Sequence, residues 1–397
     1  WVVSQEKFWE GVPKWFTHLK FRGSWGKNGS IGALNNYLYA TSMATSGKYA
    51  YGNDSDYKYI TGSSPSSMGN DELTWETSTQ LNIGLDARFL SDRLTLTADY
   101  FNKKTDDLLV SGLKPSLIAG GTFSPMNAGS VSNKGLELEL GWRDKIGKDF
   151  NYSIRTNLST LKNEVTYLNK GIDYIEGHKL LNDLVTIFEE GSEVWHFYGY
   201  KFTGIDPSNG EPTFEDLDGD GEITTNDRTN IGSAIPNMTY GVTLSASYKG
   251  FDALVFGTGT AGNKIYQCLF SSDRAMGNRI YGEWYENRWT EDNTGGDKPA
   301  ATADISKYMI SSAMVKDGSF FKIKQIQLGY TLPKTLMSKI SVSNLRLYVS
   351  LDDWFTFTKY KGFDPESSSA GTGSGQGIDV STYPISKKFV VGVNLTF

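Results

Sequence analysis

Alternating apolar and polar residues run through most of this chain and constrain its fold more than any other feature. In QLNIGLDARF (80–89), Leu81 and Ile83 fall on one side of an extended strand, and Asn82 and Asp86 fall on the other. Comparable stretches are LTLTADY (94–100), LELELGW (136–142), YSIRTNLST (152–160), YGVTLSASY (240–248) and NLRLYVSL (344–351). A period of two residues indicates β-strands with one apolar and one polar face. We therefore expect an all-β fold.

A period of two fits both a soluble sandwich, which buries its apolar face, and a membrane barrel, which turns that face to lipid. Connection lengths favour the barrel. Short links at 90–93, 143–149 and 249–250 alternate with long polar stretches, as is common in outer-membrane barrels. The alternating runs also cover about 9–11 residues, enough to cross a bilayer at a tilt. Strands of soluble proteins average about 5–6 residues.

The C-terminal stretch KFVVGVNLTF (388–397) points the same way. It places apolar residues on one face and ends on Phe397. An aromatic last residue on the lipid face resembles the assembly signal of bacterial outer-membrane barrels, whereas the alternative is a core strand that stops at Phe. Together with the connection and strand lengths, it favours a transmembrane antiparallel β-barrel.

We predict that residues 1–397 form one barrel portion with long extracellular loops. The loops are expected at about 26–74, 102–131, 161–193, 207–236, 261–318 and 357–386. Eleven strands are expected, near 16–25, 75–89, 93–102, 132–143, 149–160, 194–205, 237–249, 251–260, 319–331, 343–356 and 387–397. Counting strands from the two ends places 207–236 on opposite sides, so one strand within 161–206 is missed or wrongly assigned. We follow the count from the C-terminus, which places 207–236 outside the cell.

Composition and motifs exclude several function classes. The net charge of −6 and the lack of a basic stripe argue against a nucleic-acid partner. The single cysteine, Cys268, precludes an intrachain disulfide. No GxSxG elbow, HExxH motif or phosphate loop is present, and Glu137 and Glu139 read as lumen-facing residues rather than a glycosidase pair. We expect the chain not to be an enzyme.

Several long stretches resemble the SusC/RagA family of TonB-dependent outer-membrane transporters. They are DYFNKKTDDLL (99–109), NAGSVSNKGLELEL (127–140), the run from FYGYKFTGIDP to GTAGNKIY (197–266), and residues 317–366 with LGYTLPK and FTKYKGFDPE. The similarity covers most of the chain from about residue 75. One departure is LDDWFT (351–356), where the family usually has Gln-Asn-Leu before the Phe.

The resemblance implies a barrel of 22 strands together with a plug domain and a TonB box, and the stretches above correspond to neither the plug nor the TonB box. We interpret the chain as the C-terminal half of such a barrel. A half barrel has two open edges whose backbone groups cannot be satisfied in lipid. It is therefore expected to be part of a larger protein that spans the bacterial outer membrane.

Residues 216–227 read DLDGDGEITTND and match the spacing of a calcium-binding loop. The crowded carboxylates repel one another unless a cation neutralises them. The predicted ligands are Asp216, Asp218, Asp220, Glu222 through its carbonyl, Thr224 through its hydroxyl or a water, and Asp227 in place of the usual closing Glu. No amphipathic helices flank the loop, so an EF-hand domain is not expected. We expect a structural Ca²⁺, with Mg²⁺ or a metal-free turn as the alternatives.

A second candidate site is the loop YGEWYENRWTED (281–292), where aromatic side chains lie among charged ones. The residues proposed for substrate or partner contact are Tyr281, Trp284, Tyr285, Arg288 and Trp289. Aromatics beside carboxylates suit sugar rings, and Trp, Tyr and Arg are also favoured at protein interfaces. In the family that the chain resembles, such loops meet a SusD-like surface lipoprotein that covers the barrel.

The resemblance thus implies import of oligosaccharides, or peptides, into the periplasm together with a SusD-like lipoprotein and the TonB complex. Oligosaccharides are favoured because the loops are rich in aromatics. The alternative is a β-rich surface module that binds carbohydrate or protein and carries a calcium-stabilised loop. The sequence leaves the cargo open, and also whether two transporters pair as a dimer.

Overall fold

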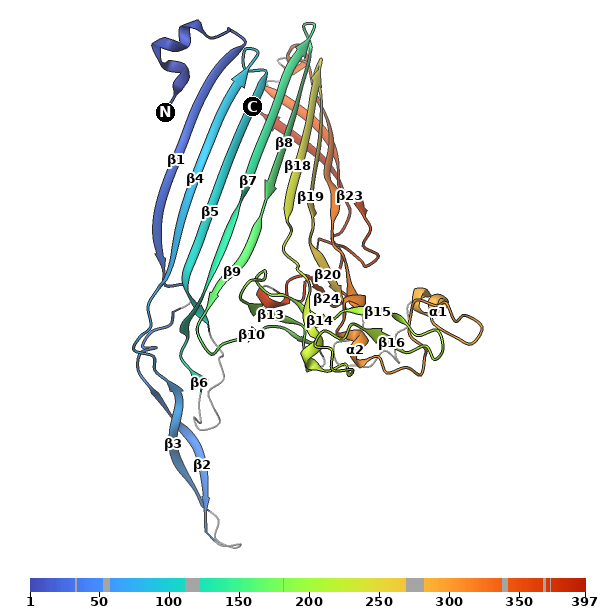
Figure 1. Cartoon of the computed structure of the whole chain (residues 1–397). Coiled ribbons are helices and arrows are strands. Elements are labelled where there is room, and N and C mark those ends of the chain that lie inside the picture. Colours follow the sequence, from blue (N-terminus) through green and yellow to red (C-terminus); the bar gives the residue numbers. More distant parts are fainter. Residues whose placement is uncertain are drawn as a thin grey trace.

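The computed structural model describes residues 1–32, 34–52, 58–110, 122–180, 182–268, 282–337, 342–366, 369–371 and 373–397. One large antiparallel sheet dominates it (Figure 1), which confirms the all-β prediction. Ten strands follow one another in it: β1 (Phe16–Ser30), β4 (Glu76–Phe89), β5 (Leu94–Val110), β7 (Met126–Ile146), β8 (Phe150–Thr160), β18 (Met238–Tyr248), β19 (Phe251–Ala261), β22 (Phe320–Thr331), β23 (Asn344–Thr358) and β25 (Lys388–Thr396). An eleventh strand, β9 (Lys162–Leu168), pairs with the far end of β7.

The pairing register sorts the side chains into the two predicted faces. One row of directly paired residues crosses nine strands and is polar at every position except Gly241: Lys20, Asp86, Thr97, Glu139, Asn157, Gly241, Thr258, Lys322 and Thr356. The next row is apolar: Phe21, Leu85, Ala98, Leu138, Leu158 and Tyr240. We call these the polar face and the apolar face. Leu136, Leu138 and Leu140 on the apolar face remain about half exposed.

The two ends of the sheet differ in their connections. At the end with short links, which we call the turn end, residues 90–93, 147–149 and 249–250 join neighbouring strands, and 332–343 form a longer link that contains α3 (Lys334–Met337). At the other end, which we call the loop end, the connections are 31–75, 111–125, 161–237, 262–319 and 359–387. The strands β5 and β7 extend far into the predicted loop 102–131, to residues 110 and 126.

The predicted barrel strand at 194–205 is wrong. The structure divides that range between β14 (His196–Tyr200) and β15 (Phe202–Ile205), which belong to two small sheets outside the large one. The strands β8 and β18 instead pair directly with each other, and the amide of Leu161 donates to the carbonyl of Asn237 at 2.9 Å. Residues 161–237 are therefore one excursion at the loop end, which removes the disagreement between the two strand counts.

Three of the long connections fold together beside the loop end (Figure 1). Four small sheets form there. They are β10 (Tyr174–Glu176), β13 (Thr186–Glu189), β14 and β17 (Arg228–Gly232); β11 (Lys179–Leu180) with β12 (Asp183–Leu184); β15 with β16 (Pro212–Phe214); and β21 (Val315–Asp317), β20 (Lys264–Gln267) and β24 (Ile378–Asp379). Short helices accompany them: α1 (Gly282–Asn287), α2 (Ser306–Met309), η3 (Thr225–Asp227), η5 (Ser312–Met314) and η7 (Gly373–Gly375). We call this part the loop module.

The loop module has its own hydrophobic core. Phe197, Tyr266 and Ile378 come from three different connections and are completely buried in one shared cluster. Cys268 lies buried in the same core, where it is a packing residue. Burying these side chains provides the free energy that orders three long connections into one unit.

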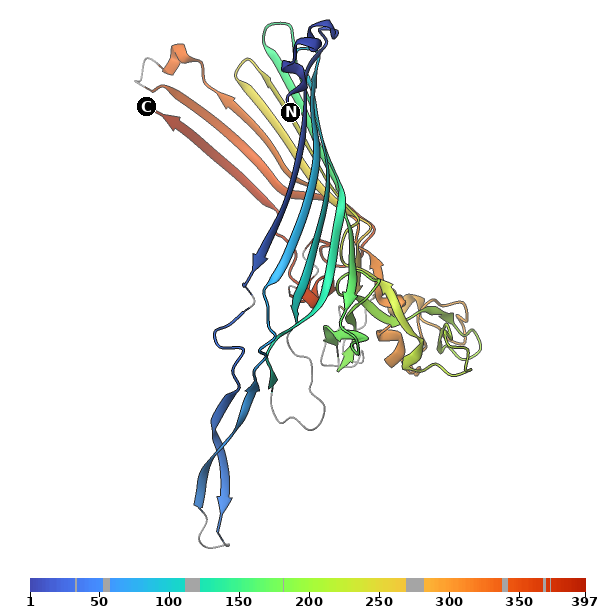
Figure 2. The same cartoon turned by 60° about the vertical axis from the view of Figure 1, so that its left-hand side comes forward.

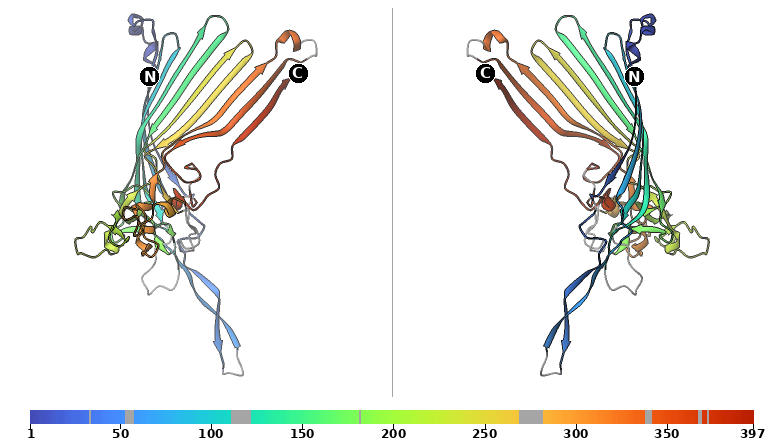
Figure 3. Two further views of the ribbon diagram at one scale, coloured as in Figure 1. Left: turned by 90° about the vertical axis from the view of Figure 1, so that its right-hand side faces the viewer. Right: turned by 90° about the vertical axis from the view of Figure 1, so that its left-hand side faces the viewer.

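A hairpin of β2 (Ser42–Tyr51) and β3 (Lys58–Met68), with the short strand β6 (Thr122–Phe123) at its base, extends away from the sheet at the loop end (Figure 1). The sheet itself is an open, curved fan whose outer strands β1 and β25 lie far apart at the turn end (Figures 2 and 3). Among the described residues, no helix has both the length and the apolar character needed to cross a membrane.

Candidate cation site and recognition surface

The acidic loop lies in the loop module between β16 and β17. Carboxylate oxygens of Asp216, Asp218 and Asp227 come within 4.8 Å of one another, although nine residues separate Asp218 from Asp227. Gly219 and Gly221 make this fold possible because both have positive φ, +74° and +89°. Their amides donate to the two oxygens of Asp216 at 2.7 and 2.9 Å.

Asp227 organises the loop from within. Its side chain is fully buried, and it accepts hydrogen bonds from the backbone amides of Leu217 and Thr224, each at 2.7 Å. It also closes a capping box with Thr224 at the start of η3. The amides, that of Thr224 above all, hold the pKa of Asp227 below its usual value because they stabilise the carboxylate.

The structure thus brings together three of the four predicted aspartate ligands, and the carboxylate of Asp220 is not part of this group. The carboxylate of Asp220 accepts the amide of Glu222 at 2.8 Å, and the hydroxyl of Thr224 accepts the amide of Asn226 at 3.2 Å. An all-oxygen donor set suits Ca²⁺ or Mg²⁺ rather than a softer metal.

The aromatic segment divides into packed and exposed residues. Trp284 packs edge-on against Tyr308 at 5.4 Å, and the indole of Trp289 donates to the carbonyl of Pro207 at 3.0 Å. Tyr285 is 66% exposed, and the guanidinium of Arg288 lies 5.2 Å from its ring centre. Tyr281 lies outside the described residues. Tyr285 is therefore the predicted contact residue best placed to meet another molecule, with the half-buried Arg288 beside it.

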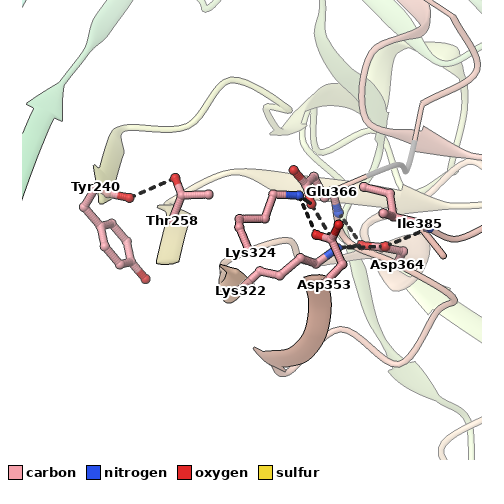
Figure 4. A network of polar contacts seen from close by, with 8 residues as sticks. All are labelled: Tyr240, Thr258, Lys322, Lys324, Asp353, Asp364, Glu366 and Ile385. Carbon is pink, nitrogen blue, oxygen red and sulfur yellow. Dashed lines mark hydrogen bonds and ion pairs between the residues drawn. The ribbon is translucent and has the colours of Figure 1, made fainter. Parts of the chain in front are cut away.

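A network of ion pairs that no sequence pattern predicted joins the 359–387 connection to the sheet (Figure 4). Lys322, only 1% exposed, places its ammonium 2.9 Å from both Asp364 and Glu366. Lys324 reaches Asp353 and Glu366 at 2.8 Å. The two lysines are two positions apart on β22 and so lie on the same side of the strand, next to a register shift between Ile323 and Gln325. The two lysines that interrupt the apolar positions of FFKIKQIQ were the available signal.

Comparison with known proteins identifies the family to which this fold belongs. Residues 11–352 match the family model described as "TonB dependent receptor-like, beta-barrel". The chain belongs to this family. It is 32% identical over its full length to the TonB-dependent receptor P3 of Formosa agariphila and 30% identical to the TonB-dependent receptor SusC of Bacteroides thetaiotaomicron. It spans about two fifths of these curated relatives, 41% and 39% of their lengths.

Solved structures agree with the family assignment. The RagAB peptide transporter superposes on the whole chain with a TM-score of 0.81 at 27% identity, and the chain covers 42% of that protein. The "open-open" state of the RagAB peptide importer gives a TM-score of 0.82 at 26% identity. The chain is thus a SusC/RagA-type part of a TonB-dependent receptor barrel, as its sequence motifs indicated.

TonB-dependent receptor barrels belong to the outer membrane, so the apolar face of this sheet meets lipid and the polar face lines the lumen. Family membership favours the transporter over the surface module that the sequence left open. On the polar face, near the turn end, a recess of about 620 Å³ is lined with basic residues beside a few acidic ones. Its cations are Lys20, Arg88, Arg93, Arg143 and Arg155, and His18 also lines it. Phe397 follows β25 directly and is 85% exposed.

Proposed function

We propose that this chain belongs to an outer-membrane importer that takes up oligosaccharides. Its large sheet forms part of the barrel wall, and its loop module forms part of the region that binds cargo. The polar row across nine strands carries this proposal, since it gives the lumen a continuous hydrophilic wall below an ordered loop module. In this arrangement the loop end faces the cell exterior, where cargo is captured. The turn end faces the periplasm, where cargo is released.

A SusD-like surface lipoprotein and the TonB complex complete the proposed machine. The likeness to SusC and to RagAB supports both partners, and the parts that would contact TonB lie outside these residues. Tyr285 and Arg288 are proposed to contact the lipoprotein, because an exposed Tyr beside an Arg is typical of protein interfaces. The chain's own residues bind and guide cargo, and no catalytic step is proposed.

Oligosaccharide is the proposed cargo because exposed aromatics and carboxylates occur together at the loop end. Tyr174, 41% exposed, lies 6.1 Å from Tyr198 and opposite Glu189 in the β10–β13 pair. Aromatic faces stack on sugar rings, and carboxylates accept hydrogen bonds from their hydroxyls. A peptide is the second candidate, which the structural likeness to the RagAB peptide importer favours.

The three-carboxylate group is proposed to hold one structural Ca²⁺. Support comes from the loop template and from the 4.8 Å grouping of Asp216, Asp218 and Asp227. A bound cation would offset the repulsion among these carboxylates and tie the excursion 161–237 together. It would act on the shape of the loop module and not on cargo directly.

Growth and uptake test the transport proposal. A strain that lacks the gene should lose growth on one class of oligosaccharide while it still grows on the corresponding monosaccharide. Loss of growth on oligopeptides alone would select the peptide alternative. In a separate test, the protein should stay in the membrane fraction after washing with salt and carbonate. Release without detergent would contradict the membrane location.

A further inference from the structure

The first sixteen residues form an aromatic-rich segment at the turn end, beside β1 (Figures 1 and 2). It contains two short 3-10 helices, η1 (Val3–Gln5) and η2 (Lys7–Gly11). Nothing in the transport proposal requires this segment. Three of its large apolar side chains are exposed: Trp1 by 65%, Phe8 by 64% and Trp15 by 55%. Exposed apolar groups gathered on one element mark a contact surface.

The contacts of these side chains show which way the segment faces. Trp1 exchanges two backbone hydrogen bonds with Phe21, each of 2.9 Å, and so lies opposite a residue of the apolar face. Trp15 stacks on Phe89, another residue of the apolar face, at 6.0 Å. Phe8 packs edge-on against Trp1 at 6.3 Å. The aromatic side of the segment therefore continues the surface that meets lipid.

The polar side chains of the segment point elsewhere. The hydroxyl of Ser4 is hydrogen-bonded at 3.1 Å to the imidazole of His18, which lines the recess on the polar face. The indole nitrogen of Trp1 donates to Glu6 at 3.0 Å while the ring itself stays exposed. An aromatic body with a hydrogen-bonded polar tip is the arrangement found at membrane–water interfaces.

The segment also extends an aromatic band along the turn end of the sheet. Rings occur where four other strands begin or end there: Phe150, Tyr248, Phe251 and Tyr330. Such bands mark the depth of the lipid headgroups in membrane barrels. The charges of the segment balance, since Glu6 and Glu10 offset Lys7 and Lys14. Attraction to the surface must therefore come from aromatic burial and not from charge.

We infer that residues 1–16 form an interfacial anchor, with Trp1, Phe8 and Trp15 inserted into the phospholipid headgroup region of the leaflet at the turn end. The occupant of this surface is lipid because the surface is continuous with the lipid-facing side of the sheet. The anchor fixes how deep the turn end sits in the membrane.

Spin labels on the whole transporter, reconstituted in phosphatidylcholine vesicles, test this inference. Labels are placed by Phe8→Cys and Trp15→Cys, with Gln5→Cys as a water-exposed control and Leu138→Cys as a mid-membrane control, after the native cysteines are replaced. Collisions are measured with oxygen, which enters lipid, and with a nickel chelate, which stays in water. The oxygen-to-nickel ratio at both anchor positions should lie between those of the two controls.

Two results would overturn the inference. A ratio at residue 8 equal to that at residue 5 would place the segment in water. Protection of residues 8 and 15 from both reagents would show that protein and not lipid covers them. Adding phosphatidylglycerol should leave the ratios unchanged, and a large shift would show that charge drives the contact. A water-like ratio at residue 138 would instead contradict the membrane-spanning sheet itself.

Discussion

Arg346 and Asp252 form an ion pair although their strands, β23 and β19, are not neighbours. The strand β22 runs between them, and the guanidinium reaches across it to the carboxylate at 2.9 Å. The bridge passes over Gly329, which is paired with Asp252 on one side. Arg22 and Asp99 repeat the arrangement at 2.8 Å across Gly84. A glycine on the middle strand thus opens the space in which lumen side chains can link every second strand.

Replacing Gly329 with Ala should distort this bridge. The added Cβ would lie 2.5 Å from both Arg346 Nη2 and Asp252 Oδ2, so these side-chain ends must shift and the bridge is distorted. Because both atoms end flexible side chains, we expect a loss of only about 1 kcal/mol or less in the free energy of unfolding. Gly23→Ala is the matched control, since nothing lies within 4 Å of a Cβ there. Urea unfolding in detergent measures both, and equal midpoints for the two variants would contradict the steric account.

The buried lysine Lys322 should be essential for holding the 359–387 connection. Lys322→Met leaves the carboxylate of Asp364, 6% exposed, without its cation. Removing one partner of a buried ion pair lowers the free energy of unfolding by about 3–5 kcal/mol. Lys162→Met, which removes an exposed pair with Glu164, should cost under about 1 kcal/mol. Limited proteolysis should cut the connection 359–387 in the first variant only.

A double variant distinguishes the effect of the ion pair on stability from the effect of side-chain packing. Adding Asp364→Leu to Lys322→Met removes the uncompensated charge and should recover part of the lost stability. If the double variant is as unstable as the sum of the two single variants, the ion pair does not act as a unit.

Removal of divalent metal should loosen the loop module. Asp218→Asn removes one of three grouped carboxylates, so the variant should bind less Ca²⁺ and its loop module should unfold at the same temperature with or without a chelator. Asp173→Asn, an exposed change elsewhere in the excursion, should behave like the parent. Elemental analysis after dialysis gives the metal content. Equal content in the parent and Asp218→Asn would refute the site.

The depressed pKa of Asp227 predicts a pH dependence of this loop. Its folded pKa lies below the unfolded value, which is about 3.9 for Asp. Its charged form therefore stabilises the fold fully above the unfolded pKa, and that contribution is lost as the pH falls through the folded pKa. The unfolding temperatures of the parent and Asp227→Asn should differ at pH 6 and converge toward pH 2. A constant difference would contradict this assignment.

The thiol of Cys268 should react slowly with alkylating reagents while the loop module is folded. Burial raises the pKa of its thiol to about 11, so roughly one thiol in a thousand is ionised at pH 8. Alkylation at pH 8 should be slow in the native protein and fast in denaturant. Rapid labelling of the native state would show that the core of the module opens readily.

Sequence patterns predicted the large sheet well because alternation is a local property. Leu136, Leu138 and Leu140 identify their face without reference to any other strand. The error at 194–205 has the same origin. His196, Tyr198 and Tyr200 do alternate with other residues in a true strand, β14, but a period of two does not reveal which sheet a strand joins. Only the pairing of β8 with β18 excludes it from the large sheet.

The candidate sites depend more on distant contacts, and they were harder to predict. The loop template did anticipate that Asp216, Asp218 and Asp227 lie close together, because one short segment holds all three, and their role as metal ligands stays a prediction. The hydrogen bond from the ammonium of Lys322 to the carboxylate of Asp364 joins residues 42 positions apart, and no rule of sequence spacing predicts it. Likewise, the sequence of residues 281–292 did not show that Trp284 packs inward while Tyr285 points outward.

The excursion between β8 and β18 starts and finishes on hydrogen-bonded neighbours, Leu161 and Asn237. The wall on either side is paired along all 11 residues of β18. The excursion nevertheless stays tied to the wall through β9, which pairs with β7. Insertions or deletions between β9 and β18 can therefore change the surface that meets the cell exterior while β8 and β18 keep their pairing register.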